Sequence, residues 1–156
     1  MPSIIVETRI AAPRGRVFDL SRDVGAHAES SAFTGERIVE PGRTSGLLEH
    51  GDLLTFEGRH LGVRQRVTVR ITEMDPPRRY VDEGVGGPLR ELRHVHEFVA
   101  EGGDVTLMRD VVTWRSPFGI VGRAADALFV TRHMRWFVSE KQARLKAMAE
   151  ARFLPR

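Results

Sequence analysis

Short stretches of alternating apolar and polar residues fill most of the chain before Ser116. Such alternation predicts strands, because successive side chains of a strand point to opposite faces. The clearest stretch is Val63–Met74, in which Val67, Val69 and Ile71 alternate with arginines and threonines. Further strands are predicted at Ser3–Ile10, Glu36–Glu40, Leu47–Gly58, Arg79–Glu83, Leu89–Val99 and Val105–Trp114. One face of this sheet is apolar and the other polar and basic, which is typical of an antiparallel sheet with one face in water.

Two short helices are predicted directly after the first strand. Pro13 suits the start of a helix that runs through Val17 and Leu20, because proline fixes φ and lacks the donor that a first turn leaves unpaired. A second helix is predicted over Asp23–Ser31, with the side chain of Asp23 as its N-cap. The predicted order is therefore one strand, two short helices, about six strands and a final helix.

A helical period replaces the alternation from Ser116 to about Glu150. Pro117 and Gly119 suit a turn that leads into this helix. At about 100° per residue, one stripe collects Ile120, Ala124, Ala127, Thr131, Met134, Val138, Leu145 and Ala149. We expect this stripe to face the sheet, with ligand contacts from Ile120–Val138 and few beyond Lys141. A second apolar set, Leu128, Phe129 and Trp136, lies on another side, where a homodimer surface is the alternative use.

Composition limits the classes of function. A chain of 156 residues is most simply a single domain, 1–156, with a core of useful size. It has no cysteine, which excludes disulfides, thiolate metal sites and a cysteine nucleophile. The net charge is only +3 and acidic residues are interspersed among the arginines, so nucleic-acid binding is not expected.

The sequence carries no pattern of membrane insertion or export. No apolar run approaches the ~18 residues of a membrane span, so no integral membrane segment is predicted. The N-terminal residues Met1–Glu7 lack the charged and apolar regions of a signal peptide. We therefore expect the protein to be cytoplasmic.

Two histidines on one predicted strand are the sharpest chemical feature. His94 and His96 share a strand face with Leu92 and Phe98, whose apolar character suggests that this face is the inner one. On the neighbouring strand, one face carries Thr106, Met108, Asp110, Val112 and Trp114, and the other carries Val105, Leu107, Arg109, Val111 and Thr113. If the first of these is the inner face, Asp110 lies near His94 or His96. Such a pair would fix an imidazole tautomer and create a general base.

Each chemical interpretation has a plainer alternative. The cluster of His94, His96 and Asp110 fits a polar wall that orients a ligand, a catalytic base, or a buried network that satisfies itself. His60 would complete a set of three histidines, but it lies in a predicted turn and no HExxH-type spacing is present, so no metal is expected. Asp82 and Glu83 point to opposite strand faces, so we interpret them as charges at a strand end.

Several strings in this order of elements resemble the START-like (SRPBCC) superfamily, in particular a bacterial branch of polyketide cyclases/dehydrases. They are RHLGV at Arg59–Val63, ITEMDPPRRYVDE at Ile71–Glu83, GGPLRELRHVHEF at Gly86–Phe98 and SPFGIVGRAADALFVTRHM at Ser116–Met134. The resemblance implies an α+β helix-grip fold. In that fold an antiparallel sheet of about seven strands wraps around the long C-terminal helix and encloses a ligand cavity. It implies no agreed set of catalytic residues and no cofactor.

The resulting hypothesis is a domain that binds a hydrophobic small molecule, such as a lipid, a quinone or a polyketide-like compound, between sheet and helix. The alternative is a polyketide cyclase or dehydratase that uses His94 or His96 as its general base, so the sequence is compatible with a binding protein and with an enzyme. The residues expected to contact the ligand are Phe56, His60, Leu92, His94, His96, Phe98, Met108, Asp110, Trp114, Ala127, Met134 and Val138.

Overall fold

A curved antiparallel sheet of seven strands forms the body of the computed structural model, which describes residues 1–153. The strands are β1 (Ser3–Ile10), β2 (Arg37–Val39), β3 (Leu53–His60), β4 (Val63–Asp75), β5 (Arg79–Gly86), β6 (Glu91–Ala100) and β7 (Thr106–Arg115). Their spatial order is β1-β7-β6-β5-β4-β3-β2. The strands from β3 to β7 are therefore joined by successive hairpins, and β1 pairs with β7. The predicted strands are confirmed, although β3 begins only at Leu53, because Gly51 precedes it in a turn with a φ of 88°.

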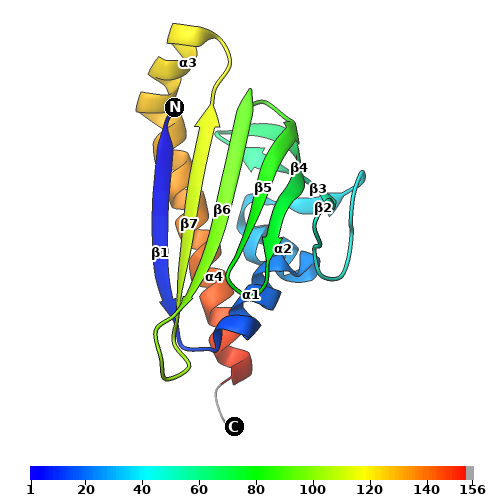
Figure 1. Cartoon of the computed structure of the whole chain (residues 1–156). Helices are drawn as coiled ribbons and strands as arrows, with labels where there is room; N and C mark the ends of the chain where they lie inside the picture. Colours follow the sequence, from blue (N-terminus) through cyan, green and yellow to red (C-terminus); the bar gives the residue numbers. More distant parts are fainter. Residues whose placement is uncertain (154–156) are drawn as a thin grey trace.

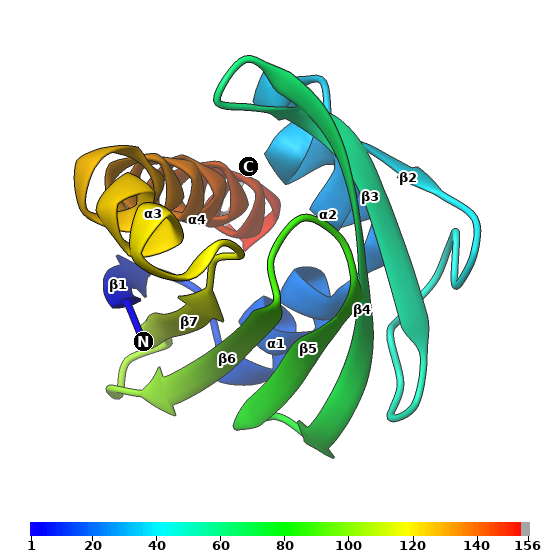
Figure 2. The same cartoon turned by 90° about the horizontal axis from the view of Figure 1, so that it is seen from above.

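The two predicted short helices are also confirmed. They are α1 (Arg14–Arg22) and α2 (Val24–Ser31), followed by a 3-10 turn at Ala32–Thr34. The side chain of Asp23 accepts a hydrogen bond of 2.9 Å from the backbone N–H of Ala26, as an N-cap does. These helices close one end of the space that the sheet curls around (Figures 1 and 2).

The C-terminal helix runs along the concave side of the sheet, but it is not one regular helix. It consists of α3 (Gly119–Ala125), a π-helical turn at Asp126–Val130, and α4 (Thr131–Phe153). Figure 1 shows α3 at the upper end of the molecule, above the N-terminal end of β1, with α4 descending beside β1 and β7. The second half of the predicted stripe is confirmed, because Val138, Leu145 and Ala149 are buried.

The first half of the predicted stripe faces outward. Ile120 is 75% exposed, and Ala124 and Ala127 are exposed as well. The buried positions here are instead Gly122 and Asp126. A carboxylate oxygen of Asp126 accepts hydrogen bonds from the indole N–H of Trp114 at 2.9 Å and from the hydroxyl of Ser116 at 2.5 Å.

Polar anchoring therefore sets the orientation of this segment. The bonds of Asp126 and the close approach of Gly122 to the Pro117 carbonyl turn the less apolar side of α3 inward. The π-helical turn then inserts extra backbone and brings Met134 and Val138 into line with the inner face. A hydrophobic stripe counted at a constant α-helical period cannot show either effect.

Replacing Gly122 with alanine tests this anchoring. The added Cβ would collide with the backbone carbonyl oxygen of Pro117, so we expect the free energy of unfolding to fall by about 1–3 kcal/mol. The matched control is Gly15→Ala in α1, where the new Cβ meets no atom within 4 Å. That change should stabilise the protein by about 0.5–1 kcal/mol. Urea denaturation measures both, and a Gly122→Ala variant as stable as the parent would contradict this account.

The core lies in two clusters on the concave face of the sheet. The larger one packs α1, α2 and the lower half of α4 against the sheet around Phe18, Tyr80 and Phe98, whose rings meet at centroid distances of 5.3–6.2 Å. The smaller cluster contains Trp114 and Val138 under the upper half of α4. The candidate site is lined by residues of both clusters.

Candidate functional site

A cavity of about 310 Å³ opens between the sheet and the C-terminal helix. Its walls are mostly apolar and come from Phe56, Val67, Val69, Leu89, Leu92, Val112, Val130, Met134, Phe137 and Val138. Titratable side chains also line it: His27, Glu36, His60, Asp82, His94, His133 and Lys141. An apolar cavity with a few convergent polar groups is the usual form of a small-molecule site, and this volume lies at the lower end of the ~300–1,000 Å³ range of such sites.

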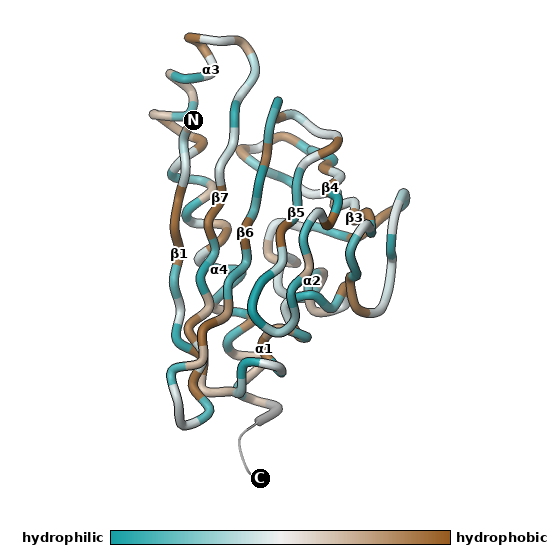
Figure 3. Tube along the Cα trace, viewed as in Figure 1, coloured by the Kyte–Doolittle hydropathy of each residue, from teal (hydrophilic) through white to brown (hydrophobic). Residues whose placement is uncertain are grey.

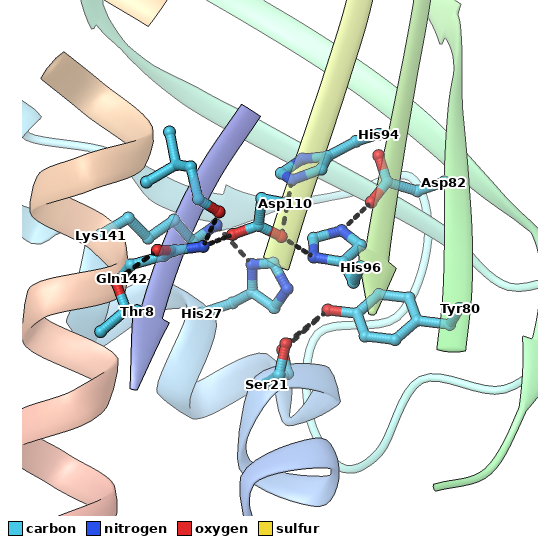
Figure 4. A network of polar contacts seen from close by, with 11 residues as sticks. Thr8, Ser21, His27, Tyr80, Asp82, His94, His96, Asp110, Lys141 and Gln142 are labelled. Carbon is cyan, nitrogen blue, oxygen red and sulfur yellow. Dashed lines mark hydrogen bonds and ion pairs between the residues drawn. The ribbon is translucent and has the colours of Figure 1, made fainter. Parts of the chain in front are cut away.

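The inner polar cluster, Asp82, His94, His96 and Asp110, is assembled by strand register. In neighbouring strands His94 pairs with Asp82 and His96 pairs with Asp110, so the four side chains meet on the concave face. Nε2 of His96 lies 2.8 Å from Oδ2 of Asp82, and its Nδ1 lies 2.8 Å from Oδ1 of Asp110. Figure 4 shows His96 bridging the two carboxylates, with Tyr80 below it and His94 beside it.

His94 approaches the same carboxylate from the cavity side. Its Nε2 lies 3.0 Å from Oδ1 of Asp110, and its ring stacks on His96 at a centroid distance of 3.8 Å. The contacts of His94 and His96 with Asp110 are ion-pair distances without hydrogen-bond angles, whereas the contact of His96 with Asp82 is a hydrogen bond. Asp110 therefore lies beside both histidines, where the sequence led us to expect His94 or His96.

The two histidines differ in charge. Burial lowers the pKa of His96, but the carboxylates of Asp110 and Asp82 outweigh that effect and raise the pKa to about 9. Burial, together with the neighbouring positive His96, lowers the pKa of His94. Burial opposes ionisation of Asp110, yet the two histidines hold the pKa of this carboxyl far below its ordinary value. At neutral pH His96 is thus the cation of the cluster, and the cavity-lining His94 is neutral.

A lysine extends the cluster toward α2 and α4. Nζ of Lys141 donates a hydrogen bond of 2.8 Å to Nδ1 of His27, so this ring nitrogen is unprotonated. Burial and the charge of Lys141 lower the pKa of His27 well below its ordinary value, which keeps the ring neutral. Behind them the amide of Gln142 donates to Oδ2 of Asp110 at 2.6 Å. Because Gln142 also bonds to Thr8 and to the carbonyl of Val6 in β1, contacts at this place connect α4 and α2 with four strands, β1, β7, β6 and β5 (Figure 4).

A second polar group, which we call the rim cluster, consists of Glu36, His60 and His133. Nδ1 of His60 lies 2.8 Å from Nε2 of His133, and Nε2 of His60 lies 3.1 Å from a carboxylate oxygen of Glu36. Burial and the neighbouring His60 lower the pKa of His133. The rim cluster connects the end of β3 to the first turn of α4 across the cavity.

The structure brings half of the predicted contact residues to the cavity wall. Those on the wall are Phe56, His60, Leu92, His94, Met134 and Val138. His96, Met108 and Asp110 lie one layer deeper, around a small hollow next to the cavity. Phe98 and Trp114 are buried in the two core clusters, and Ala127 is exposed to solvent, because the anchoring through Asp126 turns that part of the helix outward.

The side chains of Asp82, His27 and Lys141 were not expected in the site. Asp82 was interpreted as a charge at a strand end, but it is only 7% exposed and holds His96. Its position opposite His94 depends on the pairing register of β5 with β6. Lys141 continues the inward stripe one turn after Val138, which was the one available signal in the sequence.

The zinc alternative that combined His60 with His94 and His96 has no geometric basis, because His60 belongs to the rim cluster. Asp82, His94 and His96 do place one potential ligand atom each within 4.8 Å of one another. His96, however, carries a proton between two carboxylates, and a metal ion would have to displace that proton.

Comparison with known proteins identifies relatives over nearly the whole chain. The family model described as polyketide cyclase / dehydrase and lipid transport matches residues 1–150. No curated protein sequence matches the chain. Several solved structures do, at sequence identities that establish the fold alone.

Three of these structures illustrate the similarity. A protein of Thermus thermophilus is 19% identical, with a TM-score of 0.75 over 96% of this chain and 98% of its own. The Zhui aromatase/cyclase of a Streptomyces species is 15% identical, with a TM-score of 0.75 over 98% of this chain and 96% of its own. A START superfamily protein of Mycobacterium smegmatis is 10% identical, with a TM-score of 0.65 over 96% of this chain and 97% of its own.

Proposed function

The chain belongs to the polyketide cyclase/dehydrase and lipid transport family, and from this membership we propose that it binds one small apolar molecule in the cavity beneath its C-terminal helix. The observation that supports the proposal most directly is that His94, Asp82 and Lys141 line the same cavity as a large set of apolar side chains. Apolar walls supply affinity through burial, and a few polar groups fix the orientation of the ligand.

The charges of these polar groups indicate the chemistry of the ligand's polar end. Lys141 is a cation and hydrogen-bond donor, and Asp82 is an anion and acceptor, so their charges offset each other. His94 is neutral, and its Nε2 faces Asp110, which leaves Nδ1 for a ligand. Lys141, Asp82 and His94 are therefore matched best by a neutral group that both donates and accepts hydrogen bonds, such as a phenol, an enol or a hydroxyl next to a carbonyl. A carboxylate or a quaternary amine matches them less well.

The size of the cavity restricts the ligand further. About 310 Å³ suits a compact ring system or a single short chain, and not a two-chain phospholipid. The proposed ligand is therefore a phenolic, quinone-like or polyketide-like compound, with its oxygen end at His94 and Lys141 and its apolar body between Leu92 and Met134.

Filling the cavity should abolish binding. Met134→Trp places a bulky ring on the cavity wall, and we expect it to weaken binding of the neutral fluorescent probe N-phenyl-1-naphthylamine at least tenfold, because the two volumes overlap. Ala147→Trp, at an exposed position of the same helix, is the matched control and should leave the dissociation constant unchanged. Fluorescence titration measures both. Equal weakening in the two variants, or none in Met134→Trp, would contradict binding at this cavity.

An enzymatic role is the second candidate, and the neutral His94 is what favours it. His94 lines the cavity, its lowered pKa leaves it unprotonated at neutral pH, and Asp110 stabilises the imidazolium that would form on proton abstraction. His96 is less suited to this role because its pKa of about 9 leaves it already protonated. His94→Gln should stop turnover of a poly-β-keto thioester while probe binding persists; turnover at the parental rate would remove this candidate.

A further inference from the structure

We propose that the outer face of α3 and of the helical turns after it, together with the loops beside the cavity mouth, docks on an anionic membrane surface. The proposal rests on exposed apolar side chains, on the sign of the charges among them and on their place next to the cavity. It does not depend on the identity of the cavity's ligand.

The outer face of this segment is strongly apolar. Phe118 is 81% exposed, Ile120 75% and Val121 71%, while Leu128 and Phe129 are each 61% exposed. Trp136 continues the face at the start of α4 with 49% exposure. This is the reverse of an ordinary surface helix, whose apolar side faces the core. Figure 3 shows hydrophobic stretches of the trace around α3 at the upper end of the molecule.

The face is apolar because polar groups hold the segment from behind. Asp126 and Gly122 provide the inner contacts, so the hydrophobic residues are free to point away from the sheet. Nothing in the anchoring requires phenylalanine or leucine on the outer side. Contiguous exposed apolar residues of this kind mark an interaction surface.

All charged side chains at the surface of this segment are positive. Between Ser116 and Ser139 the ionic residues are Arg123, Asp126, Arg132 and Arg135, besides His133. The three arginines lie at the surface, and Asp126, the one acid, is buried. Amphipathic surfaces that combine large apolar side chains and an interfacial tryptophan with arginines bind anionic lipid headgroups.

The face is continuous with the mouth of the cavity. β3, β5 and β7 run in the same direction in the antiparallel sheet, so the segments that follow them lie at one end of the molecule, where Figure 2 looks onto them. At that end Leu61, Val63 and Val85 are also exposed, and Leu61 lines the cavity. Pro117 and Val130 line the cavity from the helical segment itself. A bilayer docked here would face the opening through which an apolar ligand enters.

A second copy of the chain fits this surface less well. A two-fold contact through the same face would bring the arginines of both copies together without a carboxylate from this segment to offset them. The structure has no helix among residues 1–153 that is long and apolar enough to cross a bilayer. The surface therefore suits attachment to one leaflet.

Co-sedimentation with lipid vesicles tests the proposal. The protein should bind vesicles of phosphatidylglycerol and phosphatidylcholine, bind pure phosphatidylcholine much more weakly, and be released by high salt. Leu128→Ser combined with Phe129→Ser should lower the partition coefficient at least tenfold. Arg132→Gln should lower it about fivefold, as the loss of one cation near an anionic surface implies.

Matched controls use exposed residues away from this end. Val99→Ser replaces an exposed apolar residue at the far end of β6, and Arg144→Gln removes an arginine from the exposed side of α4; neither should change binding. Equal binding by all variants, or no binding to anionic vesicles, would overturn the proposal. So would sedimentation equilibrium that shows a dimer which Leu128→Ser with Phe129→Ser dissociates, since the face would then be a contact between copies.

Discussion

Replacing His96 with glutamine is expected to lower the free energy of unfolding by about 3–5 kcal/mol, the typical cost of removing one partner from a buried ion pair. His96 is only 3% exposed and is the cation between Asp82 and Asp110. Glutamine can donate one hydrogen bond but no charge. Asp82 would then lose its ion-pair partner, and Asp110 would keep only His94, at 3.0 Å, as a group that can take up a proton; burial of an uncompensated charge is costly.

Urea denaturation of matched variants tests this result. Glu97→Gln changes the next residue of β6, whose side chain points to the outer face and contacts Arg109 at 3.5 Å, and it should cost less than about 1 kcal/mol. Adding Asp82→Asn to His96→Gln should recover part of the loss, because it removes one of the two unpaired charges. A loss below about 1 kcal/mol for His96→Gln, or no recovery in the double variant, would show that the ion pairs contribute little to stability.

The architecture was predictable because strand alternation and turn residues are local signals. The predicted strand Ser3–Ile10 has both of its ends correct. Asp23 is predictable as an N-cap because an aspartate directly before a helix can accept a hydrogen bond from a free backbone N–H of the first turn. The sequence does not decide which face of β7 points inward, since both faces of that strand carry apolar residues. The structure selects the face with Asp110, because Thr106, Met108 and Trp114 on that face are all buried.

The errors have a common physical origin in long-range contacts. From the sequence, Asp82 is interpreted as a charge at a strand end, because its partner His96 is separated from it by 14 residues and reaches it only through the strand register. The first half of the C-terminal stripe was assigned to the core because hydrophobicity was assumed to point inward. The hydrogen bonds of Asp126 to Trp114 and Ser116 reverse that orientation, and a periodic pattern contains no information on them.

The stability of the protein should also depend on pH through His96, by about 3 kcal/mol between pH 6.5 and pH 9. The folded-state pKa of His96 is raised to about 9, above its ordinary value of 6.5. The folded protein therefore keeps a proton that the unfolded chain releases in this interval. The contribution of His96 to the free energy of unfolding is present in full below pH 6.5. It is lost as the pH rises to about 9, at about 1.4 kcal/mol per pH unit.

Other groups around the cluster titrate as well, so the contribution of His96 has to be isolated. Burial lowers the pKa of His27 and of His94, which reduces stability below pH 6.5, and burial also lowers the pKa of Lys141, which opposes the loss at alkaline pH. Comparing the parent with His96→Gln, both in a His94→Gln background, at each pH from 6.5 to 9 removes the effect of Lys141 and that of His94, whose own pKa depends on the charge of His96. The difference in free energy of unfolding should be largest near pH 6.5 and smaller by about 3 kcal/mol at pH 9. A difference that stays constant from pH 6.5 to pH 9 would mean that His96 does not carry the charge that stabilises Asp82 and Asp110.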